Sequence, residues 1–365
     1  MSSSKHFMNY LEASMIFLQS YGIAWFSLDL LRCVIKPLVE KGKLTRDALG
    51  ALIERYAPRF RRASEAYYIE RLLWHLGLIS IRGDGEYVPT NTCHILYASM
   101  RDDESFRRSL IRVLCKWRPF VALVRYIGRK KVRVRDIIRD LGGEMKEYSM
   151  KMKRYGLLKA LGGRRRVPFA KPYNSFVVRN FFVPLLRELG LVDIDGSSIY
   201  LSFEGLELLE GIDVARTLVL RNAPFAPTAL VAYQQTLLDS KDEFILISPW
   251  VNSMLEYVMK PMDDVKKLEN IIIVLRNERD IDHVKRCASM YDVEVRAYVV
   301  DRLHAKLSCS SMGSAFLGSA NITKGSLLKN YEVGVFYMSC PEELFALAYD
   351  MISQARRYFL IKHTS

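Results

Sequence analysis

Long apolar runs are the first thing this sequence lacks. Within its 365 residues, no uninterrupted apolar stretch reaches the roughly 18–20 residues that a membrane-spanning helix needs. Residues 1–18 also lack the succession of charged, apolar and small-residue regions that marks a secretory signal. We therefore expect a cytoplasmic protein with no membrane partner.

Metal-binding patterns are missing as well. The six cysteines are scattered, none belongs to a CxxC pair, and no histidine lies at zinc-finger spacing from them. Clusters of aspartate and glutamate that would hold magnesium or calcium are not seen either. The sequence predicts reduced, mostly buried thiols, no metal site and no cofactor.

Positive charge is abundant and unevenly placed. The chain has 54 Lys and Arg against 40 Asp and Glu, a net charge of +14. Residues 211–365 hold 18 of each sign, so the whole surplus lies in residues 1–210. Residues 101–166 alone carry 21 basic and 7 acidic side chains. A concentrated positive field attracts polyanions, which favours nucleic acid, most naturally DNA, as a partner.

The first 100 residues show the element order of a winged helix-turn-helix domain. Apolar residues at helical spacing predict three helices, over residues 28–42, 46–57 and 65–77. Gly42 is expected to end the first helix, and Thr45 and Ser64 to cap the next two. Alternating apolar and polar residues then predict a hairpin that turns at Gly83-Asp84-Gly85.

The same order recurs in residues 101–210. The stretches LWHLGLISIRGDGEYVPT and LRELGLVDIDGSSIYLS both show a helix, Leu-Gly-Leu, a strand, a glycine-containing turn and a second strand. Before the second stretch, helices are expected over residues 119–128, 132–143, 146–163 and 175–190. We interpret residues 1–100 and 101–210 as tandem winged-helix domains, the second basic and elaborated.

Winged helices bind nucleic acid in some proteins and protein in others, so the pattern alone leaves both open. The charge surplus favours DNA, although charge runs usually form solvated faces. The candidate DNA-binding residues are Lys151, Lys153, Arg154, Arg164, Arg165 and Arg166.

The pattern changes after residue 210. Residues 211–240 contain RNAPFAPTAL, whose two prolines indicate a linker. Residues 241–365 then alternate apolar runs such as EFILI and NIIIVL with helical stretches, one of them broken near Pro261. This alternation predicts an α/β domain with a mixed sheet covered by helices on both faces, preceded by the mainly α tandem winged helices.

The candidate catalytic residues follow the third buried run of this domain. His304 and Lys306 lie two apart in LHAKLSC, so on a strand they would project to the same face. Ser319 and Asn321 follow in Gly-Ser-Ala-Asn, and Glu332 begins EVGVFY. Alone, His304 would be read as a core histidine and Glu332 as a strand-end carboxylate; their order with Lys306 argues otherwise.

This set resembles the HKD motif of the phospholipase D superfamily, H-x-K followed by G-S-x-N and a later acidic residue, and the resemblance covers residues 241–360. It implies a phosphodiesterase without metal. His304 would attack phosphorus as a neutral imidazole and form a phosphohistidine, while Glu332 fixes its tautomer. Lys306, Asn321 and Ser319 would hold the phosphate oxygens. The motif's aspartate is replaced here by Ser311, which puts activity in some doubt.

Only one copy of the motif is present. Members of the family with one copy pair two chains, so that the second histidine acts as general acid, and the resemblance thus implies a homodimer. The prediction is a metal-independent DNA nuclease, used for example in restriction or genome defence. The alternative is a winged-helix transcription regulator whose phospholipase D-like domain is inactive and serves ligand binding or dimerisation. Lipid hydrolysis fits the basic N-terminal part less well.

Overall fold

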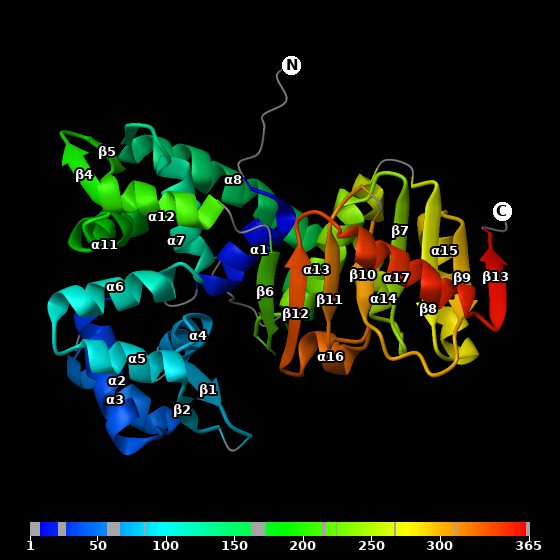
Figure 1. Cartoon of the computed structure of the whole chain (residues 1–365), viewed down its shortest axis with the longest axis horizontal. Helices are drawn as coiled ribbons and strands as arrows, with labels where there is room; N and C mark the ends of the chain where they lie inside the picture. The colour runs from blue at the N-terminus through cyan, green and yellow to red at the C-terminus, as the bar shows by residue number, and fades with distance from the viewer. Residues whose placement is uncertain are drawn as a thin grey trace. The chain divides into compact units, whose positions relative to one another are not determined.

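The computed structural model describes most of the chain, namely residues 8–20, 27–56, 66–83, 85–161, 172–213, 217–223, 225–265, 268–310 and 312–362. The chain forms two compact units (Figure 1). The first comprises Met1–Glu147 and Val167–Val214, and the second Tyr148–Arg166 and Ala215–Ser365. Among the described residues, no helix is long and apolar enough to cross a bilayer.

The beginning of the first unit has the three predicted helices and the hairpin in the predicted order, together with three helices that were not predicted. The elements are α1 (Tyr10–Gln19), α2 (Leu28–Lys41), α3 (Arg46–Tyr56), α4 (Ala66–His75), β1 (Ile79–Ile81), β2 (Tyr87–Pro89), α5 (Asn91–Ser99) and α6 (Asp103–Leu114). The predicted helices are α2 to α4, and the predicted hairpin is β1–β2. Gly42 ends α2 at φ +72°, and the Thr45 hydroxyl accepts a hydrogen bond from the backbone N–H of Ala48 at 3.2 Å. Both caps are therefore as predicted; Ser64 lies outside the described residues.

The chain from residue 118 to 213 repeats this order with additions. The elements are α7 (Arg118–Ile127), β3 (Val132–Arg133), α8 (Val134–Arg154), α9 (Leu157–Ala160), α10 (Ser175–Val177), the π-helical η2 (Val178–Phe182), α11 (Val183–Glu188), β4 (Val192–Asp195), β5 (Ser198–Leu201) and α12 (Phe203–Asp213). β3 pairs with the last strand of its hairpin, β5. Leu44 likewise pairs with Tyr87 of β2, so the repeat extends to the strand pairing.

Both hairpins are entered through the same backbone turn. After α4, Gly77 takes φ +72° and the following N–H bonds back to the carbonyl of Leu73 at 2.9 Å. After α11, Gly190 takes φ +69° and the following N–H bonds back to Leu186, also at 2.9 Å. Glycine adopts this left-handed region at low cost, and these bonds define a Schellman motif. The Leu-Gly-Leu repeat of the sequence is therefore a repeat of local structure.

One predicted helix boundary is wrong. Gly142 and Gly143 do not separate two helices, because α8 runs through both. Buried side chains follow one stripe along its length, at Ile137, Leu141, Met145, Tyr148 and Met152. Packing of this stripe outweighs the cost of about 1 kcal/mol that each helical glycine carries. Gly142 also has a packing role, since a Cβ there would lie 3.2 Å from the carbonyl oxygen of Tyr173.

The second unit is built on an eight-stranded mixed sheet. Its strands are β6 (Thr217–Asn222), β7 (Glu243–Ile247), β8 (Asn270–Leu275), β9 (Val295–Val299), β10 (Leu307–Cys309), β11 (Ala315–Gly318), β12 (Glu332–Tyr337) and β13 (Arg357–Ile361). They lie in the order β13-β9-β8-β7-β10-β11-β12-β6. β7, β8 and β9 are parallel, and every other pair of neighbours is antiparallel.

Helices cover both faces of this sheet, as predicted (Figure 1). α13 (Thr228–Asp239), α14 (Leu255–Met259) and α15 (Ile281–Tyr291) lie on one face. α17 (Glu342–Ser353) lies on the other, where Leu344 and Phe345 pack on Ile245 and Ile272. The end of α8, helix α9 and three further short helices complete the unit: η3 (Lys260–Asp264), η4 (Glu278–Asp280) and α16 (Lys324–Leu328).

The segment expected as a linker, residues 211–240, contains two elements of the second unit instead. β6 pairs along its whole length with β12 as an edge strand of the sheet. Pro227, which suggested a linker, caps α13, almost all of which is buried. Proline is common both in linkers and at the starts of helices, so its presence did not distinguish a linker from a helix start.

Candidate active site

The predicted catalytic residues meet at one edge of the sheet in the second unit. The parallel strands β7, β8 and β9 end at this edge, and β10, antiparallel to β7, begins there. β11 then ends at the same edge and β12 begins at it. His304 and Lys306 precede β10, Ser319 and Asn321 follow β11, and Glu332 opens β12. The strand order thus brings together, at one edge of the sheet, segments that are far apart in the sequence.

His304 and Lys306 lie just before β10 and not on it as predicted. The strand begins at Leu307, but its ladder continues for one more bond, from the N–H of Gly318 to the carbonyl of Lys306 at 3.1 Å. Lys306 Nζ donates to the carbonyl of His304 at 2.6 Å. The exposed His304 imidazole makes no hydrogen bond to any described residue, which leaves both ring nitrogens open to a ligand.

Ser319 and Glu332 are joined across β11 and β12. The N–H of Ser319 donates to the carbonyl of Val333 at 2.9 Å, and the N–H of Val333 donates to the Ser319 hydroxyl at 3.2 Å. The Ser319 hydroxyl in turn donates to Oε2 of Glu332, and Asn330 reaches Oε1 at 3.5 Å. Among the described residues, Glu332 therefore bonds Ser319 and Asn330, and it makes no bond to His304.

Asn321 has an unsatisfied side chain at the same edge. Its Oδ1 atom is shielded from solvent and has no hydrogen-bond partner among the described residues. Asn222, at the end of β6, differs: its Nδ2 donates to the carbonyl of Asn330 and its Oδ1 accepts from the N–H of Ala229, both at 3.1 Å. Because buried polar atoms are normally paired, the orphaned carboxamide of Asn321 points to a ligand.

Two residues at this edge were not among the predicted ones. Trp250 follows β7, and its indole meets the His304 imidazole edge-on with ring centroids 6.3 Å apart. Arg276 follows β8 and lies over the same indole, 5.8 Å from its centroid. Arg276 comes directly after a buried apolar run and Trp250 three residues after one. That position was the signal that could have found them, because ligands bind at the carboxyl ends of such strands.

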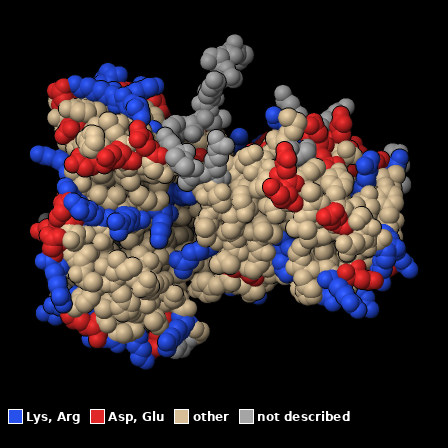
Figure 2. Space-filling view, viewed as in Figure 1, with Lys and Arg blue, Asp and Glu red and all other residues tan. Residues whose placement is uncertain are grey.

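The predicted DNA-binding residues fall outside the first unit or outside the described residues. Lys151, Lys153 and Arg154 form the last turn of α8, which belongs to the second unit. Arg154 is ion-paired with Asp264, while Lys151 lies over the ring of Tyr148 at 5.2 Å. Arg164, Arg165 and Arg166 lie outside the described residues. In Figure 2, Lys and Arg of the first unit gather over α6.

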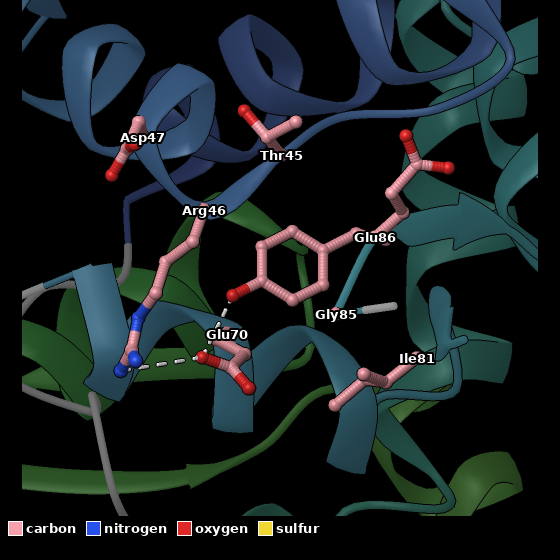
Figure 3. A pocket seen from close by; sticks show the side chains of 8 residues that line it. Thr45, Arg46, Asp47, Glu70, Ile81, Gly85 and Glu86 are labelled. Carbon is pink, nitrogen blue, oxygen red and sulfur yellow. Dashed lines mark hydrogen bonds and ion pairs between the residues drawn. The ribbon is translucent and has the colours of Figure 1, made fainter. Parts of the chain in front are cut away.

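A pocket of about 350 Å³ opens in the first unit beside the β1–β2 hairpin (Figure 3). Glu70 lies within it, accepting a hydrogen bond from the Tyr87 hydroxyl at 2.8 Å and facing Arg46 at 3.8 Å. Burial raises the pKa of Glu70, and the contacts with Tyr87 and Arg46 only partly offset this. Since the carboxylate already has these partners, the pocket is organised around its own polar network, and no predicted site residue lines it.

Neither protein-family models nor curated protein sequences match this chain. Among solved structures, it is similar to Nuc, a phospholipase D family member from Salmonella typhimurium, at 17% identity over 39% of this chain and 98% of that one, with a TM-score of 0.31. NucT from Helicobacter pylori gives 13% identity over 38% and 96%, with a TM-score of 0.28.

The archaeal chromatin protein TrmBL2, whose structure shows a mode of DNA binding, spans more of the chain. It covers 90% of this chain and 92% of its own, at 15% identity and a TM-score of 0.25. All three TM-scores lie below 0.5, so the function that follows is inferred from the geometry of this chain's own residues.

Proposed function

We propose that the protein is a phosphodiesterase of the phospholipase D type that cleaves nucleic acid. The observation that carries this proposal is the meeting of His304, Lys306 and Asn321 at one sheet edge, with the imidazole and the carboxamide both lacking partners among the described residues. A structural role would leave these groups bonded to the protein, as Asn222 is. The amide N–H of Asn321 can donate to an anionic ligand, and the unbonded imidazole can attack its phosphorus.

The geometry suggests a role for each group. His304 attacks phosphorus as a neutral imidazole, breaking the bond to the leaving oxygen and forming a phosphohistidine that water then hydrolyses. Lys306 and the Asn321 carboxamide bind the non-bridging oxygens and stabilise the five-coordinate transition state. Ser319 and Glu332 form a rigid pair beside them, with Glu332 the candidate for orienting an imidazole. These side chains supply the positive charge and the donors, so a metal ion is not required.

We propose a homodimer, because each chain offers one suitable histidine and the leaving oxygen needs an acid. Exposed apolar residues on the sheet face opposite α13 support the homodimer. Val219 is 73% exposed and Val333 is 63% exposed on neighbouring strands of that face. Figure 2 shows hardly any charged side chain over β6 and β12. The face continues into the site, since Val333 bonds Ser319. A second copy of this chain would bury the apolar surface and bring a second His304.

The first unit is proposed to bind DNA as tandem winged helices. Its two helix-and-hairpin repeats, each closed by a strand pairing to the last hairpin strand, support the winged-helix interpretation. Residues 1–210 carry a net charge of +14, of which residues 148–166 of the second unit supply +7; the remainder lies in the first unit and supports a polyanion as its ligand. In this arrangement the first unit would bind the nucleic acid and the second unit would cleave it.

Cleavage of labelled DNA in EDTA tests the proposal. Wild type should retain activity in the chelator, and His304→Ala should lose it while still binding DNA and unfolding at an unchanged temperature. A variant of the exposed His94 on α5, His94→Ala, is the matched control and should keep wild-type activity. If wild type binds DNA but cleaves neither DNA nor RNA, the nuclease proposal is wrong and the transcription-regulator alternative is favoured. Hydrolysis of anionic phospholipid vesicles alone would indicate a lipid substrate.

A further inference from the structure

Trp250 lies beside three other side chains of the candidate site, those of His304, Arg276 and Lys306. Trp250 is 40% exposed, and the His304 ring meets it edge-on at an interplanar angle of 83°. Arg276 and Lys306 both lie over its ring, at 5.8 and 5.9 Å from the centroid. The indole therefore connects the nucleophile with two cations.

The two cations differ from those basic residues of this unit that are ion-paired. Arg286 pairs with Glu256 at 3.5 Å, and Arg356 pairs with Asp301 at 3.3 Å. Neither Arg276 nor Lys306 has a carboxylate partner among the described residues. A cation without a counter-ion, next to a second one, creates a local field that favours an anionic ligand. Lys306 already serves the scissile phosphate in the proposed mechanism, which leaves Arg276 without a role there.

The loop that carries Trp250 is held in place on both sides. The Ser248 hydroxyl donates to the carbonyl of Trp250 at 2.9 Å and accepts from the N–H of Ile322 at 3.2 Å. The N–H of Val251 donates to Asp280 at 3.0 Å. A loop fixed in this way presents the indole at little entropic cost on binding. Folding alone would not require an exposed tryptophan to be fixed beside a nucleophile.

We propose that Trp250 and Arg276 form a nucleotide subsite next to the scissile phosphate, with an unpaired base against the indole and a neighbouring phosphate at the guanidinium. This inference rests on the proposed function and narrows its substrate to single-stranded nucleic acid. A base inside a duplex is already stacked on its neighbours and has to be extruded before it reaches such a platform. Aromatic stacking next to a positive groove is the usual means of binding single strands, and it tolerates any base.

The test uses the full-length protein and single strands about four nucleotides long, with normal or abasic residues around the cleaved bond. Wild type should prefer the base-bearing strand by about tenfold or more in kcat/KM, and should cleave it faster than the same sequence in a duplex. Trp250→Leu should bring the base-bearing to abasic ratio close to one, with the loss falling mainly in KM. Trp250→Phe keeps a ring and should restore most of the preference.

Arg276→Gln tests the proposed contact between the Arg276 guanidinium and a neighbouring phosphate, with Arg286→Gln as the matched control. Arg276→Gln should raise KM for the short strand and reduce its dependence on salt, while Arg286→Gln should leave both as in wild type. Equal cleavage of base-bearing and abasic strands by wild type, or faster cleavage of duplex, would overturn the subsite and leave the phosphodiesterase proposal standing. If wild type cleaves no strand of any kind, the proposed function itself fails and the subsite with it.

Discussion

Two asparagines at one sheet edge have different surroundings. The Oδ1 atom of Asn321 has no hydrogen-bond partner within the part of the chain that the structure describes, while Asn222 is 3% exposed and bonds the backbone on both sides. Asn321→Ala should lower kcat on the order of a hundredfold, since a transition-state donor is lost. Its stability should hardly change, because no bond of the folded protein is broken. Steady-state kinetics and thermal unfolding of the same samples measure both effects.

Asn222→Ala is the matched control for that experiment. It should destabilise the protein by about 1–3 kcal/mol, because buried partners lose their hydrogen bonds. Properly folded molecules of this variant should still turn over near the wild-type rate. If Asn321→Ala destabilises as strongly as Asn222→Ala and keeps wild-type kcat, Asn321 is a structural residue.

Glu70 gives a test of pH dependence in the first unit. Burial raises its pKa in the folded state, so the group contributes stability below its unfolded pKa of about 4.3, and that stability is lost as pH rises through the folded pKa. Glu70→Gln removes this dependence. The unfolding temperature of the variant relative to wild type should therefore be lowest near about pH 4 and improve toward neutral pH. A difference that stays constant over this range would contradict the assignment.

At the scale of elements, the two Leu-Gly-Leu turns and helix α8 show glycine in opposite roles. Gly190 holds φ +69°, and a Cβ there would lie 2.7 Å from the guanidinium of Arg107. Gly143 lies inside α8, and a Cβ there would meet nothing within 4 Å. The same residue type is required at the first position and merely tolerated at the second.

Alanine substitutions separate these roles. Gly190→Ala should destabilise by about 1–2 kcal/mol, the cost of a left-handed conformation for a residue with a Cβ. Gly143→Ala should stabilise by about 0.5–1 kcal/mol, because alanine favours the helix interior. Thermal unfolding of the full chain measures both. Stabilisation by both substitutions would mean that the turn after α11 is not left-handed in solution.

At the scale of the whole molecule, the homodimer depends on the face that carries Val219 and Val333. Val219→Glu should shift the protein to a monomer in analytical ultracentrifugation and abolish cleavage together with dimerisation. Met290→Glu is the control, because Met290 is also exposed, at 53%, but lies on α15 on the other side of the sheet. It should leave mass and activity as in wild type. A Val219→Glu protein that stays dimeric would place the interface elsewhere.

Mixed dimers test whether two histidines share one site. Wild-type chains co-folded with His304→Ala chains and purified by tag should show almost no turnover, although half of their histidines are intact. A protein with one independent site per chain would instead retain half the rate.

DNA binding by the full-length His304→Ala protein should be strongly salt-dependent, because the charge surplus of residues 1–210 meets phosphates. Replacing Arg164, Arg165 and Arg166 with alanine should reduce the slope of log affinity against log salt by about one for each phosphate that is no longer neutralised, equally for all sequences. Arg286→Ala is the control and should not alter the slope. A triple variant that loses affinity for only one sequence would mean that these residues read bases.

Most of the local elements and the candidate catalytic residues could be predicted from the sequence. Apolar periodicity, cap residues and left-handed glycines act within a few residues, so helices α2, α3 and α4, both hairpins and the buried strands β7 and β8 could be predicted locally. His304, Lys306, Asn321 and Glu332 could be named because their order along the chain is itself a pattern.

Features that depend on contacts between distant segments of the chain could not be predicted and are seen in the tertiary structure. Helix α8 continues through Gly142 and Gly143 because a continuous stripe of its side chains is buried. Residues 217–222, where prolines nearby suggested a linker, form strand β6 because they pair with β12. The bond from Ser319 to Glu332, and the placing of Trp250 and Arg276 beside His304, follow from strand order. Strand order is set by pairing between segments far apart in the chain, and a linear pattern does not contain that information.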